Sequence, residues 1–543
     1  MSLTDKISNI KLLQKIYTKI KFSPDKKTRQ LFKQFSEKYD RKYFTENKYK
    51  KVLFCPFAPH QINIVREGLF AHACKIRGAE VKMITYDLYL DAIDFRGKKV
   101  KKDLKVSYGI NDKMYNLLKL ETVKMSPFFD ENKTYNISFN TLEPVDIQNL
   151  TYKDIFLGDL VIASTIRYLF CNEAEWYNPE FMKLVRNYAH SAVVLIDIYE
   201  KIIDTEKPDK IVFSHGIYVT WGTLFRIARK KGVSVDVYGG SYRKNTLRFY
   251  HNTPYAPFPD ALWSEYKNIE LTEKEEKKLE KYFFSRETQS EDSITLFDDN
   301  SKLSENLKNF ISEGKNKKIP ILALFANISW DAYMFSSSNT NFSSMVDWLT
   351  SVINFISKRN DVKLIIKAHP AEKYFKIPEK YYVRNMLPDI LSENIIFIDN
   401  DENIKPFDLY KYIDAGLIYL STVSIEMALK NIPVITSGDI SQYSGKGFTI
   451  DPDSKEDFFN VLHKFINKEI NFVPDKELAK RYMYYRFIRE ALFFDLINVE
   501  NYYKVAKYNL KSVKELYPGK NNVVDIICNG ILNDGEFINK SFN

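Results

Sequence analysis

The residues best suited to chemistry follow short apolar segments in the C-terminal half of the chain. The first group, Lys367, His369 and Pro370, comes directly after the apolar run at 362–366. A lysine ammonium and a histidine N–H both donate hydrogen bonds, and a proline restricts the turn that carries them. These donors could hold a phosphate. The alternative is that His369 is an ordinary solvated loop residue.

Three hydroxyl residues and one acid form the second group. Ser421, Thr422 and Ser424 follow the expected strand Ala415–Leu420, at the point where the next helix should begin. Free N–H groups at a helix N-terminus, together with hydroxyls, bind anions such as phosphate. Serine and threonine are also good N-caps, which explains one hydroxyl but not three. Glu426 could accept hydrogen bonds from ribose hydroxyls, or it could only favour the helix dipole.

A glycine-rich segment is the third candidate. Residues 437–449 contain Gly438, Gly445 and Gly447, with Lys446 between the last two. Glycine permits positive φ and a close approach of the backbone to a ligand, and Lys446 adds a cation. An ordinary surface loop would have the same composition, so both interpretations stay open.

The N-terminal half contributes possible proton acceptors. His60 follows the expected strand Lys51–Phe57, and His215 follows the expected strand Lys210–Ser214. Either histidine could act as a general base toward a hydroxyl group, or could be structural. A third candidate, Asp331, belongs to the C-terminal half. It comes after the expected apolar strand Ile319–Ala326 and should face the predicted cleft between the two domains.

These candidates share one place in the predicted fold, because each follows a strand that alternates with helices. The alternation predicts α/β domains with parallel sheets covered on both faces, and ligands bind such sheets beyond the carboxyl ends of the strands. The expected strands are Lys51–Phe57, Glu80–Tyr86, Lys210–Ser214, Val233–Tyr238, Ile319–Ala326, Val362–Lys367, Ile395–Ile398, Ala415–Leu420 and Pro433–Thr436.

Four segments are expected along the chain. Residues 1–50 form a basic leader, 51–300 an N-terminal α/β domain, and 301–470 a C-terminal α/β domain. Residues 471–543 are expected to form helices that pack back on the N-terminal domain.

The positive charge of the chain is concentrated at its N-terminus. Residues 1–51 contain 15 Lys or Arg against five Asp or Glu, which accounts for the whole net charge of +10. A neutral body argues against a nucleic-acid-binding protein, which needs a basic face. Residues 5–22 have apolar residues at helical spacing with lysines between them. This amphipathic helix could lie on an anionic membrane surface or pack on the neighbouring domain.

Cysteine usage and hydropathy indicate a cytoplasmic protein. The four cysteines, in a chain of 543 residues, have neither a metal-ligand spacing nor the density of a disulfide framework. No apolar run reaches the roughly 20 residues of a membrane-spanning helix. We therefore expect a cytoplasmic location, which the leader could make peripheral on the inner face of the membrane.

Three motifs in order resemble bacterial capsule polysaccharide biosynthesis proteins, a family that includes the Kdo transferases. They are AHPAE at 368–372, STVSIEMALKNIPVITSGD at 421–439 and YSGKGFTID at 443–451. The resemblance is clearest over residues 319–451. The short His-Pro motif is shared with bacterial sialyltransferases and CDP-glycerol glycerophosphotransferases. No family acid/base motif is matched.

The resemblance implies a GT-B-like fold, with two Rossmann-like domains facing a central cleft, and a glycosyltransferase. No DxD-type metal site is compelling in the sequence, so we expect the enzyme to be metal-independent. The donor would be a nucleotide sugar, CMP- or CDP-linked, bound by the nucleotide-sugar-binding domain 301–470. The acceptor would be a glycan or lipid-linked molecule of surface polysaccharide synthesis, bound by the acceptor-binding domain 51–300. By the same resemblance, His369, Ser421, Thr422 and Ser424 would hold the donor phosphate, with Glu426 near the ribose. The alternatives are a CDP-glycerol-type glycerophosphotransferase, a nucleotide-sugar epimerase, or a non-catalytic membrane-associated scaffold that binds glycans or nucleotides.

Overall fold

The computed structural model of the chain describes most of it after the leader. The described residues are Gln30, Lys33, 50–56, 61–88, 90, 92, 115–254, 260–290, 302–330, 341–375, 377–438, 442–501 and 504–540. The expected amphipathic helix at 5–22 and the candidate residues His60 and Asp331 lie outside them.

The N-terminal unit is built on a seven-stranded sheet in the order β14-β8-β7-β6-β1-β2-β3. Strands β3 to β7 in this order are parallel, whereas β8 and β14 are antiparallel to their neighbours. Strand β6, with the sequence KIVFS, is buried along its whole length, as expected for a central parallel strand. The strands are β1 (Lys51–Phe54), β2 (Glu80–Thr85), β3 (Glu121–Lys124), β6 (Lys210–Ser214), β7 (Ser234–Gly240), β8 (Thr246–His251) and β14 (Leu492–Phe493).

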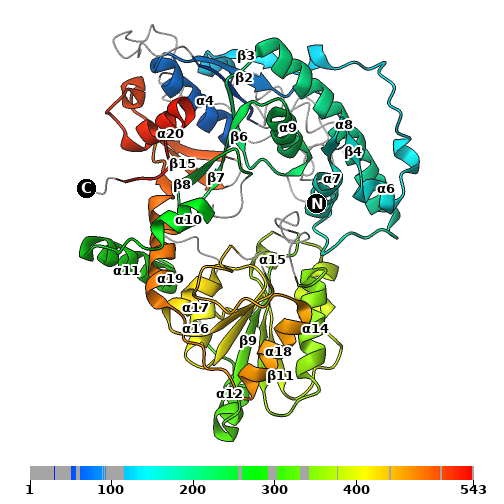
Figure 1. Cartoon of the computed structure of the whole chain (residues 1–543), viewed down its shortest axis with the longest axis vertical. Coiled ribbons are helices and arrows are strands. Elements are labelled where there is room, and N and C mark those ends of the chain that lie inside the picture. The colour runs from blue at the N-terminus through cyan, green and yellow to red at the C-terminus, as the bar shows by residue number, and fades with distance from the viewer. Residues whose placement is uncertain are drawn as a thin grey trace, which may run out of the picture.

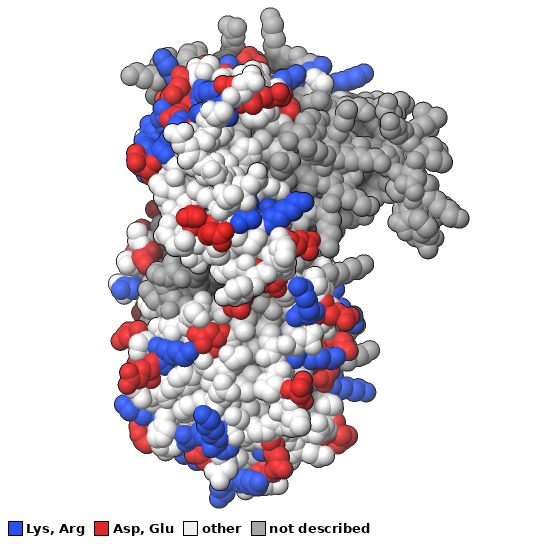
Figure 2. Space-filling model, turned by 90° about the vertical axis from the view of Figure 1, so that its right-hand side faces the viewer, with Lys and Arg blue, Asp and Glu red and all other residues white. Residues whose placement is uncertain are grey.

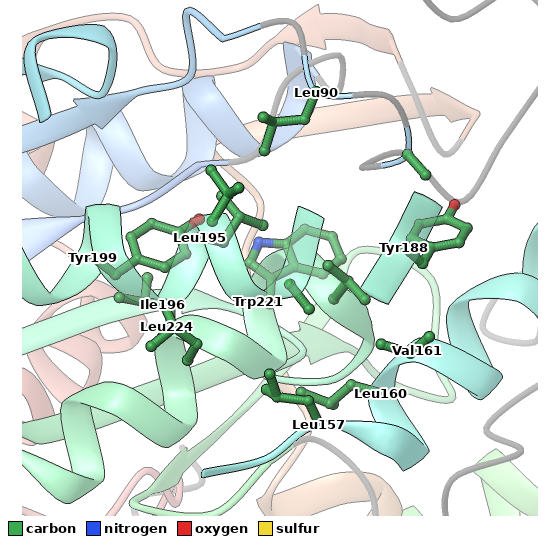
Figure 3. Close-up of a cluster of buried hydrophobic side chains, with 14 of the residues drawn as sticks. Leu90, Leu157, Leu160, Val161, Tyr188, Leu195, Ile196, Tyr199, Trp221 and Leu224 are labelled. Atoms are coloured by element: carbon green, nitrogen blue, oxygen red, sulfur yellow. The ribbon is translucent and has the colours of Figure 1, made fainter. Parts of the chain in front are cut away.

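Helices cover both faces of this sheet. On one face, α7 (Gly158–Leu169), α8 (Pro179–Glu206) and α9 (Tyr218–Lys230) share an apolar core around Trp221 (Figure 3). On the other face, α4 (Gln61–Ile76) packs against a second core. The long helix α8 begins with Pro179 in its first turn and ends where Lys207 adopts a φ of 47°.

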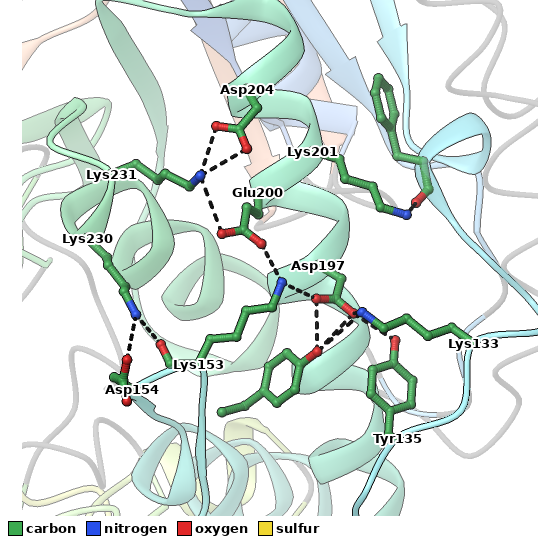
Figure 4. A network of polar contacts seen from close by, with 12 residues as sticks. Lys133, Tyr135, Lys153, Asp154, Asp197, Glu200, Lys201, Asp204, Lys230 and Lys231 are labelled. Atoms are coloured by element: carbon green, nitrogen blue, oxygen red, sulfur yellow. Dashed lines mark hydrogen bonds and ion pairs between the residues drawn. The ribbon is translucent and has the colours of Figure 1, made fainter.

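A polar network fastens the segment before α7 to helix α8 (Figure 4). The buried carboxylate of Asp197 pairs with the Nζ atoms of Lys133 and Lys153 at 2.5 and 2.7 Å. Burial alone would raise the pKa of Asp197, but hydrogen bonds from both lysines lower it overall. The segment contains η3 (Ser126–Phe128), η4 (Phe139–Thr141), α6 (Pro144–Gln148) and the paired strands β4 (Thr151–Tyr152) and β5 (Ile155–Phe156).

The C-terminal unit has a five-stranded, fully parallel sheet in the order β11-β10-β9-β12-β13. Its apolar strands are buried, and separate cores lie on its two faces. The strands are β9 (Ile321–Phe325), β10 (Lys363–Lys367), β11 (Ile395–Ile398), β12 (Ala415–Ile418) and β13 (Val434–Thr436). The helical elements are α12 (Glu305–Lys317), α14 (Met345–Ile356), α15 (Ala371–Tyr374), η5 (Glu379–Tyr381), η6 (Val383–Met386), α16 (Pro406–Tyr410), α17 (Val423–Leu429) and α18 (Lys455–Ile466).

Helix α19 (Lys476–Tyr484) joins the two units at one side (Figure 1). It packs with α17 and with α10 (Asp260–Tyr266) and α11 (Glu273–Thr288) in one apolar cluster. A π-helical turn, Tyr485–Arg489, then leads the chain back to the N-terminal sheet.

The prediction that residues 471–543 are helical is wrong for their middle part. After β14, the strands β15 (Ile497–Asn501) and β16 (Lys504–Tyr508) form an antiparallel hairpin. Strand β14 forms the edge of the N-terminal sheet by pairing with β8, so its backbone hydrogen bonds come from a segment far away in sequence. The chain then forms η8 (Val513–Leu516) and α20 (Asn522–Asn533), which packs against α4.

The described surface is mixed in charge. Figure 2 shows Lys and Arg interspersed with Asp and Glu on one face, without a single large basic patch there. Within the described parts of the chain, no helix is both long and apolar enough to cross a membrane.

The chain thus has the α/β fold of two Rossmann-like units that the sequence predicts.

Candidate functional site

The strand order gives each sheet one switch point, where successive connections run in opposite directions. In the N-terminal sheet it lies between the parallel neighbours β1 and β6, and in the C-terminal sheet between β9 and β12. The loops that leave these strands are the usual ligand sites of such sheets. His215 directly follows β6, and Ser421 and Thr422 lie in the loop after β12.

Lys367 and His369 stand at the carboxyl end of β10, next to β9. Lys367 is 3% exposed, and burial lowers the pKa of its ammonium to about 8. Nδ1 of His369 accepts a hydrogen bond of 3.1 Å from the backbone N–H of Ala371. Burial, with the nearby Lys367 charge, lowers the pKa of His369 to about 4. The neutral ring therefore carries its proton on Nε2 as a donor, and Pro370 holds the turn into α15.

Not all of the serine and threonine hydroxyls that follow β12 are hydrogen-bonded within the described residues. Oγ of Ser421 accepts a hydrogen bond of 3.3 Å from the N–H of Val423. Ser424 is fully buried, and its hydroxyl has no hydrogen-bond partner among the described residues. Thr422 is the N-cap of α17 but makes no side-chain capping bond, so the capping alternative does not account for these hydroxyls, and Ser424 is a buried polar group that calls for a further explanation.

Arg286 of α11 is the residue that the sequence analysis missed. Its Nε donates to Oε1 of Glu426 at 2.9 Å, and its Nη2 donates to Oγ1 of Thr422 at 3.1 Å. No sequence signal could find it, because Arg286 lies in a charged helix 136 positions before Thr422. The guanidinium places a positive charge beside the loop that follows β12.

Glu426 is already occupied by protein partners. Besides the bonds from Arg286, its Oε2 accepts a hydrogen bond of 2.9 Å from the hydroxyl of Tyr410. The side chain is 4% exposed. In this arrangement Glu426 orients Arg286 and ties α11 to α17, while its expected ribose contact stays a prediction.

Gly438 and Lys446 have clear structural partners. Gly438 has a φ of 118°, and a Cβ there would lie 2.8 Å from the side chain of Asn341. Nζ of Lys446 pairs with Asp260 of α10 at 2.5 Å. The glycine is therefore required by backbone conformation and packing, and the lysine links the C-terminal sheet to α10.

His215 occupies an unusual backbone position at the other switch point. Its φ is 60°, and Tyr218 three residues later has a φ of 64°. Non-glycine residues adopt such values rarely, and they concentrate at functional sites. The ring of His215 stacks on Trp221 with centroids 5.3 Å apart, and its Nδ1 is hydrogen-bonded to Oγ of Ser214.

The surroundings of His215 are cationic. Burial lowers the pKa of its imidazole to about 4, and three cationic neighbours, Arg248, Arg167 and Arg66, act in the same direction. The ring is therefore neutral at physiological pH. A neutral imidazole keeps one ring nitrogen with a lone pair, which is the chemistry that a proton acceptor needs.

Arg167 connects this histidine to the C-terminal unit. Its guanidinium lies 4.1 Å from the ring centroid of Trp330, in the segment that follows β9. Nearby, the side-chain amide of Asn172 donates to the carbonyl of Tyr381 at 3.2 Å. These contacts join the end of α7 to the segments that follow β9 and β10, and we call this contact region the junction.

Comparisons with known proteins add little to this geometry. No protein-family model and no curated protein sequence matches the chain. Among solved structures, the beta Kdo 2,4 transferase KpsC of Thermosulfurimonas dismutans is similar at 12% identity and a TM-score of 0.32, over 50% of this chain and 79% of that one. The UDP-GlcNAc 2-epimerase of Methanocaldococcus jannaschii is similar at 14% identity and a TM-score of 0.25, over 80% of this chain and 98% of that one. At these TM-scores, the description of the fold rests on the strand order and not on similarity.

Proposed function

We propose that the chain is a glycosyltransferase that moves a sugar from a nucleotide-activated donor to a glycan or lipid-linked acceptor. The observation that supports this proposal is the contact of Arg167, whose charge acts on His215, with Trp330 in the segment that follows β9. The C-terminal side presents hydrogen-bond donors that suit a phosphate, such as His369. The N-terminal side presents the neutral histidine His215 in a strained loop. The sequence motifs add the expectation of a CMP- or CDP-linked donor in surface polysaccharide synthesis.

The C-terminal side would bind the donor phosphate. Lys367, the Nε2–H of His369 and the guanidinium of Arg286 supply positive charge or hydrogen bonds at neighbouring strand ends. Such preorganised donors are worth most when negative charge develops on a leaving phosphate. Glu426 and Thr422 would orient Arg286 for this task.

The N-terminal side would bind the acceptor. An acceptor hydroxyl attacks the anomeric carbon, and the new C–O bond forms as the bond to the nucleotide phosphate breaks. The hydroxyl proton passes to the neutral imidazole of His215, while the electron pair of the broken bond leaves with the phosphate. This division of labour uses residues of the chain alone for proton transfer and charge stabilisation.

Nucleotide binding provides the first test. We expect CMP or CDP to raise the melting temperature more than UDP or GDP does. Incubation with a panel of nucleotide sugars should then release nucleotide only when an acceptor is present. Absence of stabilisation by every nucleotide would overturn the proposal. Conversion of a nucleotide sugar without any acceptor would instead identify an epimerase.

A further inference from the structure

A segment near the C-terminus, residues 534–539, runs from the end of α20 to the π-helical turn that links the two units. We call this segment the strap. At its beginning, Oδ1 of Asp534 pairs with Nζ of Lys210, in the N-terminal sheet, at 2.5 Å. At its end, the N–H of Asn539 donates to the carbonyl of Arg489 in the π-helical turn at 3.0 Å. The strap therefore ties the N-terminal sheet to the turn between the units.

His251, the last residue of β8, holds the middle of the strap. Its Nδ1 lies 2.7 Å from Oδ1 of Asp236 in β7, and its Nε2 lies 3.0 Å from the carbonyl oxygen of Gly535. The ring also packs on Phe537 of the strap, with ring centroids 4.5 Å apart. The imidazole of His251 thus joins the sheet to the strap through both of its nitrogens.

These two partners decide the protonation of His251. A carboxylate oxygen and a backbone carbonyl oxygen can only accept hydrogen bonds. A neutral imidazole has one N–H and one lone pair, so it can donate to one of these partners only and turns its lone pair toward the other. The imidazolium form alone donates to Asp236 and to Gly535 at the same time. The observed contacts are therefore those of a charged ring.

The charged groups around the ring are balanced when His251 carries its proton. Asp236 is fully buried, and its Oδ2 lies 3.2 Å from Nζ of Lys210. Lys210 and His251 thus place two positive charges beside the two carboxylates of Asp236 and Asp534. Nζ of Lys50 lies 3.3 Å from Asp534 on the exposed side of this cluster. Loss of the His251 proton would leave the buried part of the cluster short of one positive charge.

The pKa of His251 reflects the same contacts. Burial by itself lowers this pKa, and the charge of Lys210 acts in the same direction. The hydrogen bond and the charge of Asp236, together with the hydrogen bond to Gly535, outweigh both and raise the pKa above its ordinary value. The side chain is 29% exposed, so the ring can exchange its proton with solvent in the folded chain. His251 thus keeps its proton to a higher pH than an ordinary histidine, and loses it as the pH rises further.

We propose that residues 534–539 are a pH-sensitive strap, which the imidazolium form of His251 closes and which is released when the ring loses a proton. A neutral ring that keeps its N–H toward Asp236 turns a lone pair toward the carbonyl oxygen of Gly535, and the two repel each other. The strap then opens, and Asn539 no longer holds the π-helical turn. Proton uptake by His251 is thereby coupled to the rigidity of the link between the units, whatever reaction the chain performs.

Hydrogen exchange of backbone amides, followed by mass spectrometry, tests the strap in the full chain. Protection is expressed relative to the unfolded chain at the same pH, which removes the intrinsic pH dependence of exchange. Between about pH 6 and pH 9, we expect protection at 534–540 to fall about tenfold or more, since a charged hydrogen bond is lost. The π-helical turn should lose protection with the same midpoint, while β6 and α4 keep theirs. Constant protection of the strap, or an equal loss in β6, would overturn the proposal.

The pKa of His251 itself gives the second comparison. Hydrogen exchange at the imidazole C2 position measures this pKa in the same samples. We expect it to coincide with the midpoint at which the strap loses protection. Two clearly separate values would assign the release of the strap to another group and contradict the proposal.

Two substitutions at His251 should have opposite effects. His251→Gln does not titrate and has one amide nitrogen, so the strap should be open already at about pH 6, with no further change up to about pH 9. His251→Arg keeps its charge and offers several N–H donors, so the strap should stay protected over the same range. His463→Gln, at an exposed position of α18, is the control and should follow the native chain. Native protection in His251→Gln, or a native loss in His251→Arg, would show that His251 does not close the strap.

Discussion

The tautomer of His369 decides what this residue can do. Its Nδ1 is already an acceptor for the N–H of Ala371, so the neutral ring can offer only the N–H at Nε2. A neutral donor of this kind stabilises charge without having to give up its proton. This agrees with the proposed roles of His369 in phosphate binding and of His215 in proton transfer.

Replacing His369 tests this assignment at the donor side. His369→Ala should lower turnover about 10²- to 10³-fold, the usual effect of removing one donor that stabilises developing charge. His369→Asn should recover part of the loss, because its amide can also donate. The measurement is nucleotide release under saturating donor, with His463→Ala on the exposed face of α18 as the control. Equal turnover in His369→Ala and the native chain would remove the residue from the mechanism.

His72 makes the folded state sensitive to acid. The ring is fully buried, its Nε2 lies 2.6 Å from the carbonyl oxygen of Leu118, and burial lowers its pKa to about 3. Below a pH of about 6.5, His72 binds a proton in the unfolded chain but not in the folded chain. The free energy of unfolding should therefore fall as the pH drops from about 6.5 toward 3.

Urea unfolding at two pH values checks this dependence. Between pH 7 and 4.5, the His72 contribution amounts to about 2–3 kcal/mol. His72→Gln keeps a donor for Leu118 but does not titrate, so its stability should fall less over this interval. His463→Gln, at an exposed position, should follow the native chain. If the free energy of unfolding falls equally in the native chain and in His72→Gln, His72 is not the group that causes the pH dependence.

At the scale of elements, α11 and α17 are held together by two ion pairs of very different burial. Arg286 and Glu426 are 16% and 4% exposed, whereas Lys430 and Glu287 are 38% and 40% exposed. Breaking a buried pair leaves a charge without its partner, while an exposed pair contributes little. The same two helices thus provide both a test and its control.

Glu426→Gln should lower the free energy of unfolding by about 3–5 kcal/mol, because Arg286 loses its buried counter-charge. Glu287→Gln should change it by less than about 1 kcal/mol. Chemical unfolding of both variants beside the native chain measures the difference. Similar small losses in both would show that the buried pair does not hold the helices together.

At the scale of the whole molecule, the chain leaves the N-terminal sheet, builds the C-terminal unit and returns. Strand β14 adds to the N-terminal sheet, and α20 packs on α4. The two units are therefore connected twice, once before α12 and once through α19.

The basic leader gives a prediction for the full chain. Residues 1–51 account for the whole net charge, and each lysine near an anionic surface is worth about 1 kcal/mol. We expect the full chain to bind vesicles containing anionic lipid, and binding to weaken as salt is added. Deleting residues 1–48 should reduce vesicle binding without changing turnover on a soluble acceptor. If the full chain does not bind anionic vesicles, the prediction of a peripheral membrane location is wrong.

The sequence by itself determined the elements and the places where chemistry could occur. Apolar runs bounded by turn residues predicted strand β11 at its observed limits and the other C-terminal strands within two residues. Because ligands collect beyond the carboxyl ends of parallel strands, His215 and Ser421 could be singled out before any contact was known. Residue spacing determines these local features directly.

Only the tertiary structure decided which groups meet. Arg286 lies 140 positions from Glu426, β14 pairs with a strand about 245 positions earlier, and Gly535 lies 284 positions from His251. A residue's spacing says nothing about a partner so distant, and burial, which lowers the pKa values of Lys367, His369 and His215, exists only in the folded chain. Local periodicity specifies elements, whereas the charge and protonation of a site depend on neighbours that packing alone brings together.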